Sequence, residues 1–432
     1  MPAFSLEPAQ ENWCAELRAL AADRLRPLAE RGGPGRVNRP LLAELGRLGL
    51  LRRLFTSGAL DLCLMRESLG YACTEAETAL ALQGLGARPV HTHGTPAQRS
   101  RWLSAVTDGT AVAAFALTEP GAGSDAGALE LGAWRREVSD ADRADPEVGS
   151  AVGSESGVGV GVESGVGVGV GVESGVGVGV EAGVGADADG LAGWRLTGTK
   201  CWISNAPEAD FYTVFARTGP GAGSRGVTAF LVPADRPGLT GTALDMLSPH
   251  PIGTLDFDAV PVTSDDVLGE VGGGFRVAMA TLNLFRPSVG AFAVGMAQAA
   301  LDATLTHTAE RDAFGGKLRD LQTVAHQVAE MSLRTEAARL VVYAAATAYD
   351  RQAPDVPGRA AMAKLLATET AQYVVDSAVQ LHGARALRRG HLLEHLYREV
   401  RAPRVYEGAS EVQRGIIAKE LYKNLPEKEA ER

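Results

Sequence analysis

The chain has 432 residues, of which 45% are hydrophobic and 22% are charged. This composition excludes an intrinsically disordered chain, and the length predicts roughly two to three domains, each with its own core. The formal net charge is -10, and Lys and Arg are dispersed among Asp and Glu. No basic surface that could follow a phosphate backbone is expected, so nucleic acid is not a predicted partner.

Helical patterns fill the N-terminal part of the chain. Leucines and Trp13 recur near helical spacing over residues 13–28, a second run covers residues 41–51, and a third covers residues 66–86. Leu and Ala dominate these runs, while β-branched residues are scarce. We predict an N-terminal helical domain over residues 1–112.

The pattern changes near residue 111 to that of a β domain, which we predict over residues 113–268. Its segments are short, rich in β-branched and aromatic residues, and bounded by Gly, Pro and Asn, as is typical of strands and turns. The predicted strands lie within residues 110–121, 194–206, 211–218, 226–234 and 254–262.

Long helical patterns return in the last part of the chain. They cover residues 276–309, 318–349 and 358–381, and helices of this length pack side by side in bundles. We predict a four-helix bundle domain over residues 269–432. The expected fold class is therefore α+β, with an N-terminal helical domain, a middle β domain of barrel-like or sandwich form, and a C-terminal bundle.

A Gly/Val-rich repeat interrupts the predicted β domain at about residues 137–190, with copies beginning at Glu155, Glu163 and Glu173. A phosphate-binding loop would need a helix directly after its glycines. No helix-forming sequence follows, and no Lys or Arg stands between Arg143 and Arg195. We interpret the repeat as an insertion that forms a flexible loop or a weak hairpin, and we expect it to be dispensable for the chemistry.

The cysteines and the hydropathy of the chain predict a compartment. Cys14, Cys63, Cys73 and Cys201 show no CxxC spacing, so we expect buried free thiols and no metal site. Free thiols favour a reducing, cytoplasmic location. Outside the Gly/Val repeat, no run of about 18 uncharged apolar residues predicts a membrane span.

Five segments carry a resemblance to a known family. They are AFALTEPGAGSD (114–125), GTKCWISNAPEADFYTVFART (198–218), ERDAFGGKLRDLQ (310–322), AVQLHGA (378–384) and RVYEGASEVQRGIIAKEL (404–421). In order and spacing they resemble the acyl-CoA dehydrogenase flavoproteins, over nearly the whole chain except the repeat. The resemblance implies an FAD-dependent oxidoreductase that acts on CH-CH donors, converting an acyl-CoA to a 2-enoyl-CoA.

That reaction needs a base for the α-proton, a hydride acceptor, and a polarising contact with the thioester carbonyl. By resemblance, Glu407 abstracts the α-proton and the β-hydride goes to flavin N5. A carboxylate that only pairs with Arg404 or Arg414 is the structural alternative. Some relatives place the base at a position that matches Phe285, which cannot accept a proton. The residues that the resemblance places at the substrate are Ser124, Arg286, Tyr406 and Gly408.

The resemblance also implies the residues that bind FAD. Those along the flavin ring are Phe115, Leu117, Thr118, Gly123, Ser124, Trp202, Ile203 and Ser204. Those at its pyrophosphate and adenosine side, which a neighbouring subunit would supply, are Arg311, Phe314, Gln322, Gln380, Leu381, His382, Gly383, Ala409 and Glu411. Plain turns, core aromatics and surface arginines remain alternatives for these positions. Ala409 stands where the family often has Thr, and Ala384 and Arg385 also depart from the pattern.

Two subunits would build each cofactor site, so the resemblance implies a homodimer or a dimer of dimers. The substrate is expected to be a short, medium or branched acyl-CoA, with an acyl carrier protein thioester as the alternative. An electron-transfer flavoprotein is the expected electron acceptor. Flavin monooxygenases of this fold usually lack the base, so Glu407 disfavours that function, and a non-catalytic binding role built on the repeat is a further alternative.

Overall fold

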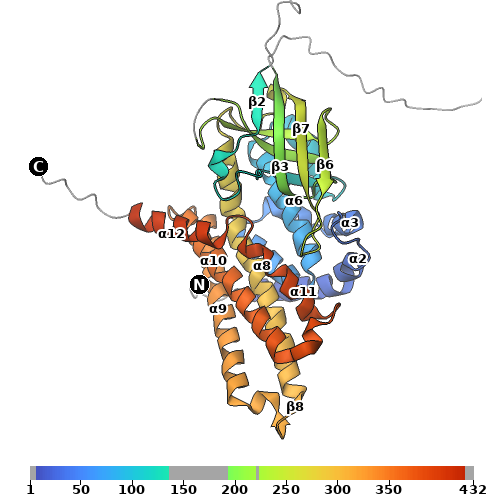
Figure 1. Cartoon of the computed structure of the whole chain (residues 1–432), viewed down its shortest axis with the longest axis vertical. Coiled ribbons are helices and arrows are strands. Elements are labelled where there is room, and N and C mark those ends of the chain that lie inside the picture. The colour runs from blue at the N-terminus through green and yellow to red at the C-terminus, as the bar shows by residue number, and fades with distance from the viewer. Residues whose placement is uncertain (1–5, 136–192, 220–222, 424–432) are drawn as a thin grey trace, which may run out of the picture.

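The structure is a computed structural model that describes residues 6–135, 193–219 and 223–423. Helices come first, a β-sheet follows, and long helices complete the chain (Figure 1). This arrangement confirms the predicted α+β class. The predicted Gly/Val insertion lies outside the described residues.

Two of the predicted N-terminal helical runs are each divided into two helices. The run over residues 41–51 is interrupted before α4, where Gly49 has φ 73°, a conformation that glycine adopts without strain. The run over residues 66–86 is interrupted at Cys73, whose backbone is extended. The helices of this part are α1 (Pro8–Leu20), continued by a wider turn over Ala21–Leu25, α2 (Arg26–Ala29), α3 (Arg39–Arg47), α4 (Leu50–Thr56), α5 (Ala59–Ala72), α6 (Thr74–His93) and α7 (Pro96–Thr107).

The described strands of the middle part form a seven-stranded sheet. Its order is β1-β4-β2-β3-β7-β6, with β5 paired to β4, and β1 runs parallel to β4. Phe211, Phe215 and Phe230 are fully buried within it. Strands β2 and β6 were not predicted from the sequence. The strands are β1 (Ala113–Ala116), β2 (Gly132–Arg135), β3 (Trp194–Ser204), β4 (Phe211–Arg217), β5 (Val227–Pro233), β6 (Leu239–Ala243) and β7 (Ile252–Val262).

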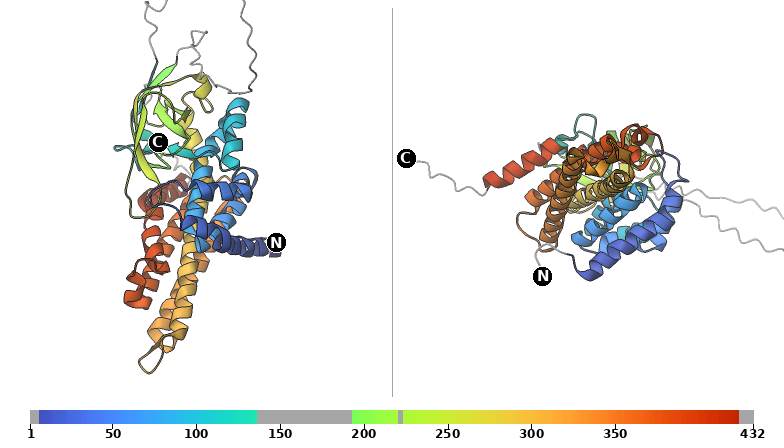
Figure 2. Two further views of the ribbon diagram at one scale, coloured as in Figure 1. Left: turned by 90° about the vertical axis from the view of Figure 1, so that its right-hand side faces the viewer. Right: turned by 90° about the horizontal axis from the view of Figure 1, so that it is seen from below.

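The long C-terminal helices extend away from the sheet (Figures 1 and 2). Small residues allow these helices to pack closely. A Cβ on Gly290 of the first long helix would lie 2.8 Å from Val342 and 3.1 Å from the carbonyl oxygen of Ala363, which stand on the next two. The elements are α8 (Gly274–Glu310), β8 (Asp312–Ala313), β9 (Gly316–Lys317), α9 (Gln322–Asp350), α10 (Val356–His382), α11 (Leu392–Glu399) and α12 (Ser410–Lys423).

Among the described helices, α8 has the length and apolar composition of a membrane span. However, 83% of its most apolar window is buried inside the molecule. The core helix of a soluble protein has the same properties, so these properties alone do not make α8 a membrane segment.

A buried ion pair joins the loop after β1 to strand β3. The ammonium of Lys200 lies 2.7 Å from Glu119 and also donates to the carbonyl of Leu117 at 2.9 Å. The carboxylate of Glu119 accepts the backbone N–H groups of Glu130 and Leu131 as well. Burial lowers the pKa of Lys200 to about 8, although Glu119 partly opposes this shift. The pair fixes two segments that are 81 residues apart in the sequence.

We expect Lys200→Met to destabilise the protein strongly, because it leaves the buried carboxylate of Glu119 without its counter-charge. The free energy of unfolding should fall by about 3–5 kcal/mol, as measured by chemical denaturation. Arg276→Met, which breaks the exposed pair with Glu270, is the matched control and should leave stability nearly unchanged. Equal stabilities for the two variants would contradict a structural role for the buried pair.

Candidate active site

A cavity of about 910 Å³ lies between the sheet, helices α6 and α8, and the segment before α12. It brings together residues that are almost 300 positions apart in the sequence, from Phe115 to Glu407. Apolar side chains such as Leu82, Leu85 and Leu282 form much of its wall. The predicted site residues that line it are Phe115, Leu117, Thr118, Gly123, Ser124, Trp202, Ser204, Arg286, Tyr406, Glu407 and Gly408.

A bulge in β3 turns Trp202 toward the cavity. The pairing of β3 with β7 is irregular between Lys200 and Ile203, and Trp202 has φ 58°, which is uncommon for a residue with a side chain. Its side chain is 57% exposed, whereas Ile203 is buried in the core and does not line the cavity. The bulge therefore gives the cavity a partly uncovered aromatic wall.

The backbone around Glu407 is held by three side chains. Arg286 and Gln413 donate to the carbonyl oxygen of Glu407 at 3.2 Å and 3.1 Å. Lys364 and Gln413 donate to the carbonyl oxygen of Gly408 at 2.6 Å and 2.9 Å. Glu407 has φ 51° and Gly408 has φ 95°, so both residues occupy the left-handed region. A strained backbone fixed in this way is typical of functional sites.

Position 408 needs a glycine for two reasons: its positive φ angle and its closeness to the side chain of Gln413. A Cβ at this position would lie 2.4 Å from the amide nitrogen of Gln413, which is the nitrogen that donates to both carbonyls. The structure therefore gives the glycine a second role beside the one suggested by the resemblance, where it leaves room for the thioester.

Glu407 is partly buried, and its carboxyl group is largely unpartnered. Its Oε2 atom is buried and has no hydrogen-bond partner among the described residues. Burial raises the pKa of Glu407 above the ordinary glutamate value, and the nearby cations of Arg66, Arg286 and Lys364 lower it only in part. Neither Arg404 nor Arg414 pairs with it: Arg404 binds Glu369 and Arg414 binds Glu411. Such a carboxyl group is suited to accept a proton.

The remaining predicted cofactor residues do not line this cavity. Arg311, Phe314 and Gln322 lie where α8 ends and α9 begins, at the opposite end of the long helices from the sheet (Figure 1). His382, at the end of α10, stacks on His307 with ring centroids 4.1 Å apart, so the segment from Gln380 to Gly383 lies at the same end. Phe314 is 90% exposed. Ala409 precedes α12, and Glu411 is exposed on its first turn.

Several polar residues of the site were not predicted from the sequence. Lys364 donates to the backbone of Gly408 and Gln413 to that of Glu407, and Arg66 and Glu77 line the cavity as a buried ion pair. Burial lowers the pKa of Lys364 to about 8, although Glu407 partly opposes the shift. The sequence signals were a Lys at helix positions that are otherwise rich in Ala, for Lys364, and a charged residue within an apolar run, for Arg66.

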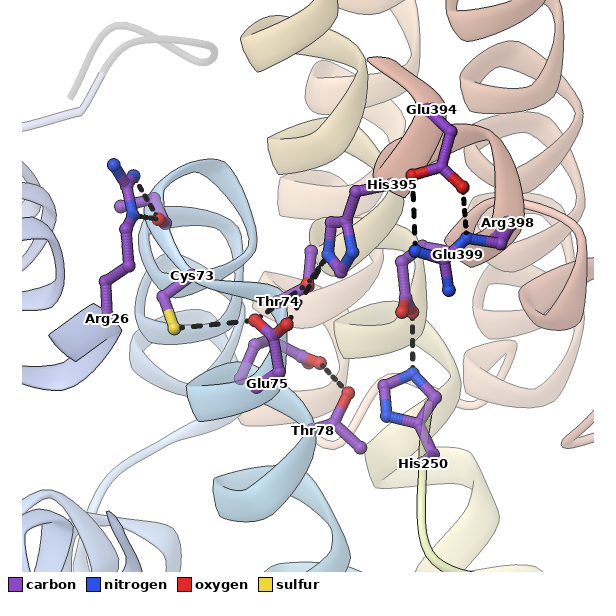
Figure 3. A network of polar contacts seen from close by, with 12 residues as sticks. Arg26, Cys73, Thr74, Glu75, Thr78, His250, Glu394, His395, Arg398 and Glu399 are labelled. Carbon is purple, nitrogen blue, oxygen red and sulfur yellow. Dashed lines mark hydrogen bonds and ion pairs between the residues drawn. The ribbon is translucent and has the colours of Figure 1, made fainter. Parts of the chain in front are cut away.

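A second polar network connects α11 to the rest of the molecule (Figure 3). The ring of His250, which lines the cavity, lies 2.6 Å from Glu399 of α11. His395 of the same helix lies 2.6 Å from the hydroxyl of Thr74 on α6. Burial alone would lower the pKa of His250, but the nearby carboxylate of Glu399 outweighs burial, and the pKa of His250 is raised. Burial alone would raise the pKa of Glu399, but His250 outweighs burial, and the pKa of Glu399 is lowered.

The sign of these shifts gives the pH range in which the pair stabilises the fold. The contribution of His250 is complete below the ordinary histidine pKa and is lost as the pH rises through its raised pKa. The contribution of Glu399 is present above the ordinary glutamate pKa and is lost as the pH falls through its lowered pKa. The pair therefore stabilises the position of α11 most at pH values between the ordinary glutamate pKa and the ordinary histidine pKa.

Comparison with known proteins adds independent evidence. Family models described as the N-terminal, middle and C-terminal domains of acyl-CoA dehydrogenase match residues 7–110, 173–260 and 272–422. The mitochondrial short-chain specific acyl-CoA dehydrogenase of Bos taurus is 33% identical over 392 residues, which cover 88% of this chain and 82% of the relative.

Solved structures with a similar fold match nearly the whole chain. Butyryl-CoA dehydrogenase from Megasphaera elsdenii is 28% identical, with a TM-score of 0.78, and the match covers 97% of this chain and 99% of the other. A structure from a study of the electron transferring flavoprotein of Acidaminococcus fermentans is 26% identical, with a TM-score of 0.79, and covers 98% and 100%.

The electrostatics of the site predict the effect of removing one cation. Lys364→Met eliminates a positive charge that lowers the pKa of Glu407, so the pKa of that carboxyl should rise further. The measurement is an infrared titration of the protonated carboxyl band, taken as the difference between each protein and its Glu407→Gln form. Lys317→Met, a surface change, is the control. An unchanged or lower pKa in the Lys364 variant would contradict the assigned coupling.

Proposed function

The chain belongs to the acyl-CoA dehydrogenase family, and from this premise we propose that it oxidises a short-chain acyl-CoA to the 2-enoyl-CoA, with Glu407 as the base. Members of the family are FAD-dependent oxidoreductases that act on CH-CH donors. The observation that carries the proposal is the partly buried Glu407, which lines the cavity and whose buried Oε2 atom has no partner among the described residues.

The residues of the cavity fit an FAD ring. Trp202 offers a partly uncovered aromatic face, and Thr118, Ser124 and Ser204 bring hydroxyl groups to the same cavity. These hydroxyls and the backbone of Phe115 to Ser124 would hold the polar edge of the ring. When bound, FAD supplies the hydride acceptor that no side chain provides.

Glu407 takes the α-proton in this proposal. The raised pKa makes its carboxylate a stronger base than an exposed glutamate, and a substrate that excludes water from the cavity reinforces this effect. Arg286, Lys364 and Gln413 position it through the backbone and leave the carboxyl free. The backbone N–H of Glu407 donates to no described residue, so it is available to polarise the thioester carbonyl.

The proposed carrier and partners follow from the relatives. Coenzyme A is preferred over an acyl carrier protein because the similar enzymes are named for acyl-CoA substrates. The similarity to a structure from work on an electron transferring flavoprotein supports such a protein as the electron acceptor.

We also propose a homo-oligomer. The predicted pyrophosphate and adenosine residues, from Arg311 to Gly383, lie away from the cavity of their own chain. The 90% exposure of Phe314 leaves it available to a second subunit. Each cofactor would then contact two chains.

Glu407→Gln tests the proposed base. The variant keeps the shape of the side chain, so it should bind FAD normally, but the rate of flavin bleaching by butyryl-CoA should fall by about 10²–10⁴-fold. The measurement is anaerobic stopped-flow absorbance at ~450 nm, the region of the flavin band.

Glu270→Gln, at an exposed position outside the cavity, is the control and should react at the wild-type rate. Unaltered bleaching in the Glu407 variant would rule out Glu407 as the base. Bleaching by an acyl carrier protein thioester but not by butyryl-CoA would favour the alternative carrier.

A further inference from the structure

The wall of the cavity formed by α5 and α6 contains a buried ion pair that the proposed chemistry does not use. Arg66 donates through Nε to Glu77, and through Nη1 to the hydroxyl of Ser288 at 2.7 Å. The two charged side chains are only 3% and 1% exposed, and both line the cavity. The pair is thus a charged feature in the wall of the cavity that also holds the proposed base.

Stability does not account for this pair. Glu77 shares its face of α6 with Ala81 and Leu85, which line the same cavity and are apolar. Replacing a buried ion pair with apolar residues of similar volume is often neutral or stabilising. A wall that served only a saturated chain would be formed equally well by apolar side chains throughout.

The hydrogen-bonding capacity of the pair is not exhausted. A guanidinium has five N–H donors, and the described residues accept from Nε and Nη1 of Arg66 alone. Nη2 has no partner among the described residues and is not among the buried atoms without a partner, so this nitrogen faces open space. The second oxygen of Glu77 accepts only a long bond, 3.3 Å, from Thr78. A donor and an acceptor are therefore available side by side.

The charges determine which group fits this position. A carboxylate would be attracted by Arg66 but repelled by Glu77, and an ammonium group would meet the reverse. A plain alkyl chain would cover the open donor and acceptor without satisfying them. A neutral hydroxyl can accept from Arg66 and donate to Glu77, so it matches both members of the pair.

We propose that Arg66 and Glu77 select acyl thioesters that carry a hydroxyl group at C4 or beyond. Arg66 and Glu77 line the same cavity as the proposed base Glu407, and the charge of Arg66 acts on that carboxyl, so the pair lies on the side of the cavity where the proposed reaction takes place. Cα and Cβ lose the two hydrogens in the proposed reaction, and the next carbons along the chain are the first that can carry the hydroxyl. This inference rests on the proposed function and specifies its substrate class.

Four coenzyme A thioesters with the same five-carbon chain test it on the unaltered holoenzyme: pentanoyl, 4-hydroxypentanoyl, 5-hydroxypentanoyl and glutaryl. At least one hydroxy substrate should exceed both pentanoyl and glutaryl in kcat/KM by about tenfold or more. If pentanoyl or glutaryl matches or exceeds both hydroxy substrates, the inference is overturned and the proposed function stands. If none of the four bleaches the flavin, both are overturned.

A double variant locates the selectivity. Arg66→Met with Glu77→Leu gives the wall an apolar surface, so pentanoyl should become better than the hydroxy substrates while FAD content is retained. Loss of the Arg66 charge also changes the pKa of Glu407, but this affects all four substrates alike and cancels in their ratio.

The exposed pair Arg276 and Glu270, changed in the same way to Met and Leu, is the matched control and should keep the wild-type ratio. A double variant at Arg66 and Glu77 that keeps the preference for hydroxy substrates would overturn the assignment to this pair.

Discussion

The site depends on one constraint: a carboxyl group must be buried without being neutralised by a close partner. At Glu407, the neighbouring polar side chains bind the backbone and not the carboxyl group. Arg286, Lys364 and Gln413 bind carbonyl oxygens of the Glu407–Gly408 segment, whereas Oε2 of the carboxyl has no described partner. The charges of Arg286 and Lys364 lie close enough to lower its pKa in part but do not bind the carboxyl directly, so the proposed base is oriented through its backbone and keeps a free carboxyl.

The opposite side of the cavity relies on a buried pair in which the ammonium and both carboxylate oxygens have hydrogen-bond partners. Lys200 and Glu119 fasten the loop after β1 to β3, and the bulge that follows Lys200 directs Trp202 into the cavity. Two buried charges thus have different uses in the same molecule. One pair fixes the aromatic wall, while the carboxyl across the cavity is the proposed base. The long helices carry the second set of predicted cofactor residues away from both, to the end that we assign to a neighbouring subunit.

Much of the fold could be predicted from the sequence, because long periodic runs such as the one in α8 have few alternatives. Strand β6 was missed because it is mostly exposed and carries little of the apolar pattern that identifies a strand. The break at Cys73 was missed because the apolar helical pattern continues on both sides of it, and Gly70 and the Thr74–Glu77 spacing were not interpreted as a helix boundary. The proposed base and the residues predicted to lie along the flavin come from sequence motifs. Arg66 and Glu77, in contrast, stand on different helices, and only the tertiary fold brings them to one cavity.

The most direct test of this account is the pH dependence of flavin reduction by an acyl-CoA in a single anaerobic turnover. A base with a raised pKa is protonated in acid, so the rate should fall as the pH decreases, with a midpoint above the ordinary glutamate value. A midpoint at or below that value, or a rate independent of pH across the acid range, would contradict the central claim that burial of an unpartnered Glu407 makes it the base.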